Sequence, residues 1–154
     1  MKIQWKKLIL CIAVPLAVGS LAGLLTRDSM QLFETLEKPP LAPPGWLFPV
    51  AWTILYVLMG IASYLVLVSG KPYRNAMILY AVQLVFNFLW PIVFFNFQLY
   101  LFAFVWLVAL WVLIFATATA FYRISKSAGI LMVPYLLWVT FAGYLNLSIY
   151  LLNG

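Results

Sequence analysis

Aromatic and carboxamide side chains recur at helical spacing in three apolar stretches of this chain. Successive members of each group lie three or four residues apart, which places a group on one face of a helix. The groups are Trp52 with Tyr56, then Gln83, Asn87 and Trp90, and finally Trp138, Ala142 and Asn146. Indole rings supply flat apolar walls, and carboxamides donate and accept hydrogen bonds. Together they favour the binding of a large, planar, mostly apolar ligand.

Residues for hydrolytic or metal chemistry are scarce. The chain has no histidine, which is the commonest general base and the commonest metal ligand. Its only cysteine, Cys11, lies in an apolar stretch, and its three acids all lie in one segment between apolar stretches. The sequence therefore predicts no metal site and no required cofactor.

Hydrophobic residues make up 67% of the 154 residues and charged residues only 8%, whereas soluble domains have about 25% charged residues. The hydrophobic residues form five runs that contain no charge and reach the roughly 17–25 residues needed to span a bilayer. The runs cover residues 8–25, 46–69, 76–95, 98–122 and 130–152. They do not alternate polar and apolar residues, as strands of a membrane barrel would. We predict one all-α membrane domain over residues 1–154, a bundle of five transmembrane helices.

The basic residues predict how this bundle is oriented. Seven of them lie before the first run or between the second and third and the fourth and fifth runs, all on one side of the membrane: Lys2, Lys6, Lys7, Lys71, Arg74, Arg123 and Lys126. Basic loops stay in the cytoplasm, so we expect a cytoplasmic N-terminus and an external C-terminus. The net charge of +6 is thus a topology signal, and nucleic acid is not an expected partner. A bacterial inner membrane fits this arrangement, with an organelle membrane as the alternative.

The external segment 26–45 is the longest connection and contains all three acids. Four prolines fall within residues 37–45, where they fix φ and extend the residues that precede them. Such a stiff segment could lie across the bundle as a lid over a ligand site, or it could be a rigid connector. Long ordered loops of this kind are often functional.

Depth separates the central tryptophans from an interfacial aromatic belt. At 1.5 Å per residue, Trp52 lies about 9 Å and Trp138 about 21 Å from the outer ends of their runs. An aromatic belt would lie at the level of the headgroups. These two side chains are therefore either core packing or the wall of a cavity in the outer half of the bundle. The amides on facing helices favour the cavity, although Asn87 could instead make only a hydrogen bond between helices.

Several stretches, read in order, resemble the TspO/MBR family of translocator proteins and bacterial tryptophan-rich sensory proteins. They are residues 36–39 (LEKP), 43–49 (PPGWLFP), 50–60 (VAWTILYVLMG), 83–95 (QLVFNFLWPIVFF) and 134–146 (PYLLWVTFAGYLN). The resemblance implies a five-helix bundle with a pocket beneath the first loop. It also implies that Trp52, Asn87, Trp90, Trp138 and Ala142 belong to this pocket, and that the protein forms a homodimer.

The same resemblance implies a function. Family members bind protoporphyrin IX, haem and drug-like hydrophobic ligands, so we expect a porphyrin-binding sensor, carrier or scavenger. Some bacterial members break down protoporphyrin in light. Since an excited porphyrin can draw an electron from indole, Trp52 and Trp138 are the candidate photochemical residues.

Two alternative functions remain beside porphyrin binding: a secondary transporter of hydrophobic ligands and a sterol-binding or sterol-transport protein. The runs lack the intramembrane charges and repeated halves that coupled transporters often show. For the sterol function, Tyr150 is followed by Leu-Leu-Asn-Gly, so no basic residue completes a cholesterol-recognition pattern there.

Overall fold

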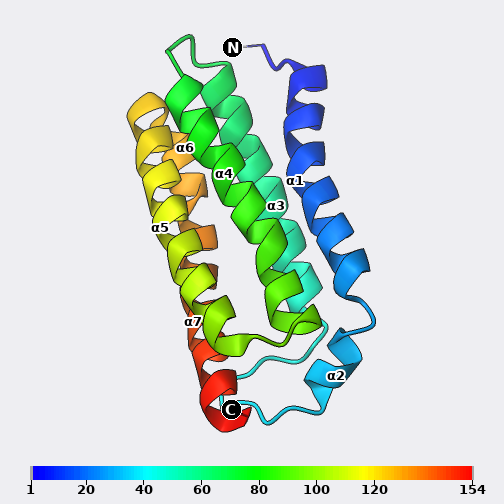
Figure 1. The fold of residues 1–154 in the computed structure, drawn as a ribbon. Helices are drawn as coiled ribbons and strands as arrows, with labels where there is room; N and C mark the ends of the chain where they lie inside the picture. Colours follow the sequence, from blue (N-terminus) through cyan, green and yellow to red (C-terminus); the bar gives the residue numbers. More distant parts are fainter. Residues whose placement is uncertain (1, 154) are drawn as a thin grey trace.

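The computed structural model describes residues 2–153, without the side chains of Gln31 and Leu32, and every regular element in that part of the chain is helical (Figure 1). The elements are α1 (Trp5–Thr26), α2 (Met30–Glu34), α3 (Leu47–Leu67), α4 (Arg74–Pro91), η1 (Ile92–Asn96), α5 (Tyr100–Ile124), α6 (Lys126–Leu131) and α7 (Val133–Asn153).

Five helical segments are long and apolar enough to cross a membrane, which confirms the predicted fold class. α1, α3 and α5 each form one span, whereas the third span joins α4 to η1 and the fifth joins α6 to α7. The observed bounds lie within a few residues of the predicted runs. α1 begins at one end of the bundle and α7 finishes at the other (Figure 1).

Four of the predicted runs contain a proline, and two of these prolines change the helix locally. Pro91 closes α4, and the following turn, η1, is a π-helix in which the Phe97 amide reaches the Ile92 carbonyl (3.1 Å). Pro134 lacks an amide hydrogen, and the helix is interrupted at Met132, between α6 and α7. The turn into α5 was predicted at residues 96–97. It extends instead to Leu99, because Gln98 adopts a left-handed backbone (φ 55°).

Glycines bring α1 against α3. A Cβ at Gly60 would lie 2.6 Å from the Cα of Ile12 and 2.7 Å from the carbonyl oxygen of Cys11. About two turns further along α1 toward the lid, a Cβ at Gly19 would overlap the ring of Tyr56. Small residues let helix backbones approach this closely in membranes. Gly19 therefore makes a contact within the bundle.

The half of the bundle near the N-terminus is tightly packed. Its fully buried side chains come from α3, α5 and α7 and the turn before α7, and include Met59, Ile114, Phe121, Met132 and Tyr135. At the other end a smaller apolar cluster centres on Phe94, Ala103 and Ile149. The cavity described below lies between the two clusters.

Residues 27–46, which we call the lid, connect α1 to α3 and contain the short helix α2 (Figure 1). Two asparagines fasten it. Asn96 accepts a hydrogen bond from the Ser29 hydroxyl (2.6 Å) and donates to the Leu25 carbonyl (2.9 Å). Asn153 accepts from the Glu37 amide (3.1 Å) and donates to the Glu37 carbonyl (2.9 Å). The lid is therefore held to η1 near its start and to α7 near its middle.

Candidate functional site

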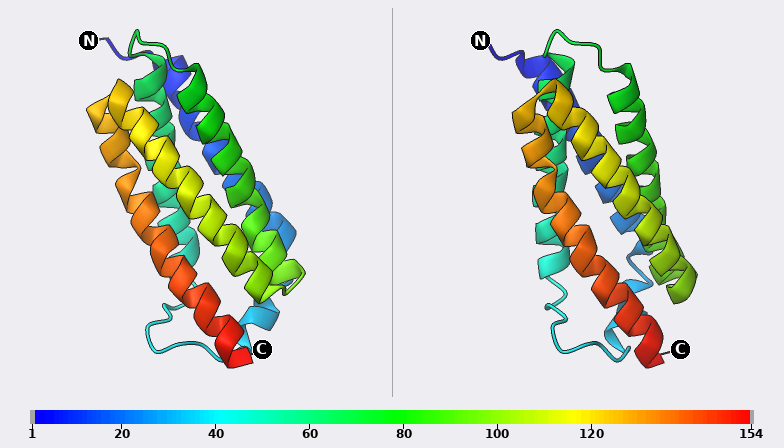
Figure 2. Two further views of the ribbon diagram at one scale, coloured as in Figure 1. Left: turned by 60° about the vertical axis from the view of Figure 1, so that its left-hand side comes forward. Right: turned by 90° about the vertical axis from the view of Figure 1, so that its left-hand side faces the viewer.

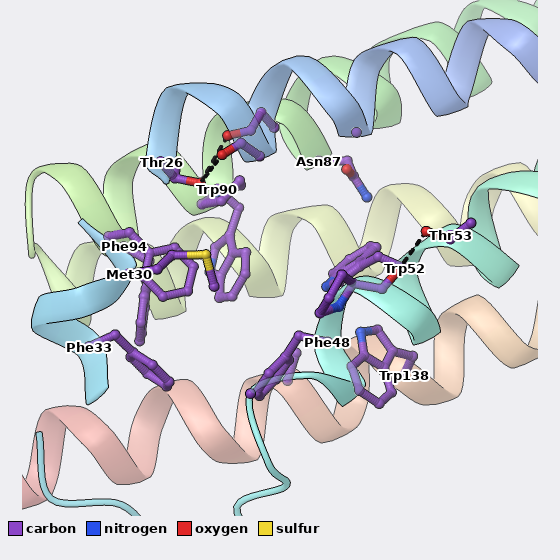
Figure 3. A pocket seen from close by; sticks show the side chains of 18 of the residues that line it. Thr26, Met30, Phe33, Phe48, Trp52, Thr53, Asn87, Trp90, Phe94 and Trp138 are labelled. Carbon is purple, nitrogen blue, oxygen red and sulfur yellow. Dashed lines mark hydrogen bonds between the residues drawn. The ribbon is translucent and has the colours of Figure 1, made fainter. Parts of the chain in front are cut away.

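A cavity of about 430 Å³ lies beneath the lid, with walls from α1, α2, α3, α4, η1 and α7 (Figure 3). Seven of the eight candidate binding residues line it: Trp52, Tyr56, Asn87, Trp90, Trp138, Ala142 and Asn146. Its volume falls within the range of about 300–1,000 Å³ typical of small-molecule pockets. Residues predicted from three separate stretches thus converge on one cavity.

Aromatic rings form one side of the cavity. The indoles of Trp52 and Trp138 are nearly perpendicular, at 88°, with centroids 6.4 Å apart. Trp52 also stacks on Tyr56, at 5.6 Å, and Phe48 meets Trp138 edge-on, at 6.0 Å. Such stacked and edge-to-face contacts stabilise the rings in place. The flat surfaces that a planar ligand would need are therefore fixed before any ligand arrives.

The predicted depths of the two tryptophans disagree with this contact. Counting from the ends of the runs separated Trp52 and Trp138 by about 12 Å, yet their rings touch. The count assumed that all spans end at one level. Figure 2 shows that α7 extends well beyond the start of α3, and that the lid runs through the space between these two levels. The depth estimate for Trp138 was wrong for this reason.

A hydrogen-bonded chain leads from the cavity into the core. The Tyr56 hydroxyl donates to Asn87 Oδ1 (2.8 Å), and Asn87 Nδ2 donates to the Tyr135 hydroxyl (2.7 Å). Tyr135 in turn donates to Gln83 Oε1 (2.7 Å). Gln83 is fully buried and does not line the cavity, since it lies one helical turn deeper than Asn87. Its position gives it a structural contact with α7 rather than the predicted place on the wall.

A second amide joins three helices. Trp90 Nε1 donates to Asn146 Oδ1 (3.0 Å), and Asn146 Nδ2 donates to the carbonyl of Tyr100 on α5 (2.8 Å). Asn87 and Asn146 are thus both engaged by protein groups, and each connects helices. Each amide retains one lone pair and one hydrogen beyond these bonds.

The Trp138 indole N–H is buried without a hydrogen-bond partner among the described residues, as are Gln83 Nε2 and the Tyr80 hydroxyl, but Trp138 is the only one of these three residues that lines the cavity. Leaving a buried donor unsatisfied costs about 1–3 kcal/mol, so such groups call for an explanation. Trp138 lines the cavity. Its nitrogen is not exposed on the cavity surface, so a ligand acceptor would supply the missing partner only after the neighbouring rings shift.

Sequence reasoning missed part of the wall and one residue behind it. Tyr135 bonds to Asn87 without lining the cavity, and it lies three residues before Trp138, a spacing that could have indicated it. α1 contributes small side chains, among them Gly19, Ser20 and Gly23, which carry no chemical signal. Phe33 comes from α2, a helix that the sequence analysis treated as loop.

Comparison with known proteins agrees with this geometry. Residues 11–152 match the TspO/MBR family. The chain is 44% identical over 150 residues to the tryptophan-rich protein TspO of Chlorobaculum tepidum, covering 95% of each chain. It is 37% identical to a tryptophan-rich sensory protein of Cereibacter sphaeroides, covering 99% of this chain and 95% of that one. With the translocator protein of Bos taurus it shares 36% identity, covering 86% and 82%. Five spans, the predicted indoles around one cavity and a family match over nearly the whole length agree: this chain is an integral membrane protein of the TspO/MBR family.

Proposed function

We propose that the cavity binds a porphyrin, such as protoporphyrin IX or haem, and that the protein acts as a membrane sensor, carrier or scavenger of this ligand. The main support is the pair of perpendicular indoles, Trp52 and Trp138, with a buried indole N–H that has no partner. A planar macrocycle can lie against the ring faces, and a carboxylate or carbonyl on its rim can accept from Trp138 once the neighbouring rings shift.

Family membership supports the coarser part of this proposal. The relatives' names describe a sensory protein in Cereibacter sphaeroides and a translocator protein in Bos taurus. These names give the relatives a sensing role in one case and a translocating role in the other, and we extend such a role to this chain. The chemistry of the cavity adds the ligand class, because its lining is mostly apolar and aromatic with few polar atoms.

Binding is tested in the dark with the full chain in lipid nanodiscs. Protoporphyrin IX is titrated, and its own absorbance and fluorescence report binding, so that changes in tryptophan content do not disturb the signal. Saturable binding that weakens in Trp52→Phe with Trp138→Phe supports the proposal. Trp111→Phe is the matched control, because Trp111 is bonded to Thr140 away from the cavity. Absence of saturable binding by the wild-type protein would refute it.

A second activity, light-dependent breakdown of the bound porphyrin, is favoured by the position of the two indoles. An excited porphyrin in contact with Trp52 or Trp138 can take an electron from the ring, with oxygen as the final oxidant. Under illumination in air, the wild-type protein should bleach protoporphyrin faster than the double phenylalanine variant at equal occupancy. Equal rates of bleaching would rule this activity out without affecting the binding proposal.

A further inference from the structure

The sides of the cavity are closed to different degrees. Toward the lid, Phe33 of α2 packs against Phe48, Phe94 and Phe95, with ring centroids 6.4, 5.9 and 5.3 Å apart. Figure 3 shows Phe33, Met30 and Phe94 gathered at this end. The Asn96 and Asn153 bonds described above hold the lid over these rings. The end of the cavity that faces the headgroups and water is therefore covered by aromatic contacts and by hydrogen bonds, except at Gly45, which lines the cavity and is exposed.

The side between α1 and α3 is open by comparison. Four residues there both line the cavity and are exposed: Ser20 and Gly23 of α1, and Pro49 and Thr53 of α3. We call this set the lateral portal. The close contact between the helices ends just before it, where Gly19 meets Tyr56. At Gly23 an added Cβ would find no atom within 4 Å.

The lateral portal lies inside two helices that are long and apolar enough to cross a membrane. Gly23 and Ser20 are three and six residues from the lid end of α1, or about 4.5 and 9 Å along its axis, and Thr53 is about 9 Å from the start of α3. Large apolar side chains flank it on the surface, including Leu24, 66% exposed, and Ile54, 55% exposed. In a membrane-spanning helix such side chains face hydrocarbon.

The polar groups at the lateral portal do not oppose an apolar passage. The Thr53 hydroxyl donates to the Pro49 carbonyl of its own helix (2.7 Å), and the nearby Thr26 hydroxyl donates to the Ala22 carbonyl (2.9 Å). Both hydroxyls are thus satisfied within one turn of backbone. Apart from the Ser20 hydroxyl, the gap presents mainly carbon to a molecule that moves through it.

We propose that the cavity exchanges its ligand sideways with the membrane, through the lateral portal between α1 and α3, and that the lid stays closed during exchange. The ligand is then a planar, membrane-partitioned molecule taken from the acyl-chain region of the leaflet next to the lid. This inference rests on the proposed function for the identity of the ligand, but the passage itself is a property of the bundle.

The test compares rate constants of porphyrin exchange in nanodiscs. Stopped-flow mixing with protoporphyrin-loaded vesicles gives association, and excess apo protein as a trap gives dissociation. Gly23→Leu combined with Thr53→Leu fills the portal and should slow both rate constants by the same factor, tenfold or more. Gly143→Leu, a matched glycine change outside the cavity, should leave both unchanged, as should Asn153→Ala, which frees the lid from α7.

If Asn153→Ala speeds both rates while the portal variant matches wild type, exchange runs through the lid and the proposal is wrong. A portal variant that alters dissociation alone also overturns it, because the residues would then be wall and not passage.

A second measurement needs no porphyrin. Lipids brominated on the acyl chain quench tryptophans that hydrocarbon can reach, and the difference between wild type and Trp52→Phe isolates the contribution of Trp52. That contribution should be present in the wild-type background and lost in the portal background. Its absence in wild type would refute the lateral portal. If porphyrin fails to bind but this quenching is present, only the proposed ligand is wrong.

Discussion

The Trp138 indole lies edge-on to Trp52, with ring centroids 6.4 Å apart, and its buried N–H has no acceptor among the described residues. By contrast, the side-chain N–H groups of Trp90, Asn87 and Asn146 each donate to another helix. Trp138 is therefore the residue at which the needs of the fold and those of a ligand can be separated by experiment.

Replacing Trp138 by Phe keeps an aromatic ring and removes the unpaired donor. Protein stability should fall only by the amount expected for burying a phenyl ring in place of the larger indole, since no protein hydrogen bond is broken. Porphyrin affinity should drop about 2–10-fold, as expected for the loss of a hydrogen bond worth about 0.5–1.5 kcal/mol. Dark titration and thermal unfolding in the same detergent measure the two effects. Unchanged affinity would mean that the ligand leaves this N–H unpaired.

Replacing Asn87 by Leu breaks the bonds to both Tyr56 and Tyr135 without a large change in volume. Interhelical hydrogen bonds in membranes contribute about 0.6–2 kcal/mol each, so we expect a loss of roughly 1–3 kcal/mol. Reversible unfolding in mixed micelles gives the free energy. Thr119→Val is the control, because its hydroxyl bonds only to the Phe115 carbonyl of its own helix. A loss no larger than that of the control would contradict a role for Asn87 in holding α3, α4 and α7 together.

Replacing Gly60 by Ala should force α1 and α3 apart, because the new methyl carbon meets backbone atoms of Ile12 and Cys11 that cannot swing aside. Overpacking of this kind costs about 1–3 kcal/mol. Gly143→Ala offers a matched control, since its nearest neighbours lie 3.9 and 4.0 Å away. Thermal unfolding followed by circular dichroism compares them. Equal stability of the two variants would show that the helices are not in backbone contact at Gly60.

The charge pattern predicts which end of the bundle faces the cytoplasm. A reporter enzyme that is active only on the non-cytoplasmic side of the membrane should be active when fused after Asn153. It should be inactive when inserted among residues 70–75, where Lys71 and Arg74 lie. Adding lysines to the lid should weaken this preference. The reverse pattern of activity would overturn the predicted orientation, and with it the external position of the cavity.

The sequence predicted the spans and most of the site for a shared reason. Helical periodicity places Asn87 with Trp90 and Trp138 with Asn146 on common faces, and polar groups in hydrocarbon must turn those faces inward. Position along the bundle axis was not predictable in this way, because nothing local says how far α7 extends past α3. The contribution of α1 to the wall could not be predicted either, since its glycines leave space without adding a side chain that could bind. Gln83 has the same helical spacing as the wall residues, but it lies one turn deeper than Asn87 and below the cavity.

The π-helical turn η1 gives the third span one place that can absorb a change in length. A π-turn accommodates one residue more than an α-turn does. Deleting a single residue between Ile92 and Asn96 would let the helix return to regular winding, and the residues after the turn would keep nearly the same direction. Deleting a residue from the regular part of α4 would instead rotate everything after it by about 100°, the angle per residue of an α-helix with 3.6 residues per turn. Asn96 would then turn away from Ser29 and Leu25, whose bonds to it hold the start of the lid. A one-residue deletion should therefore be more harmful within α4 than within η1.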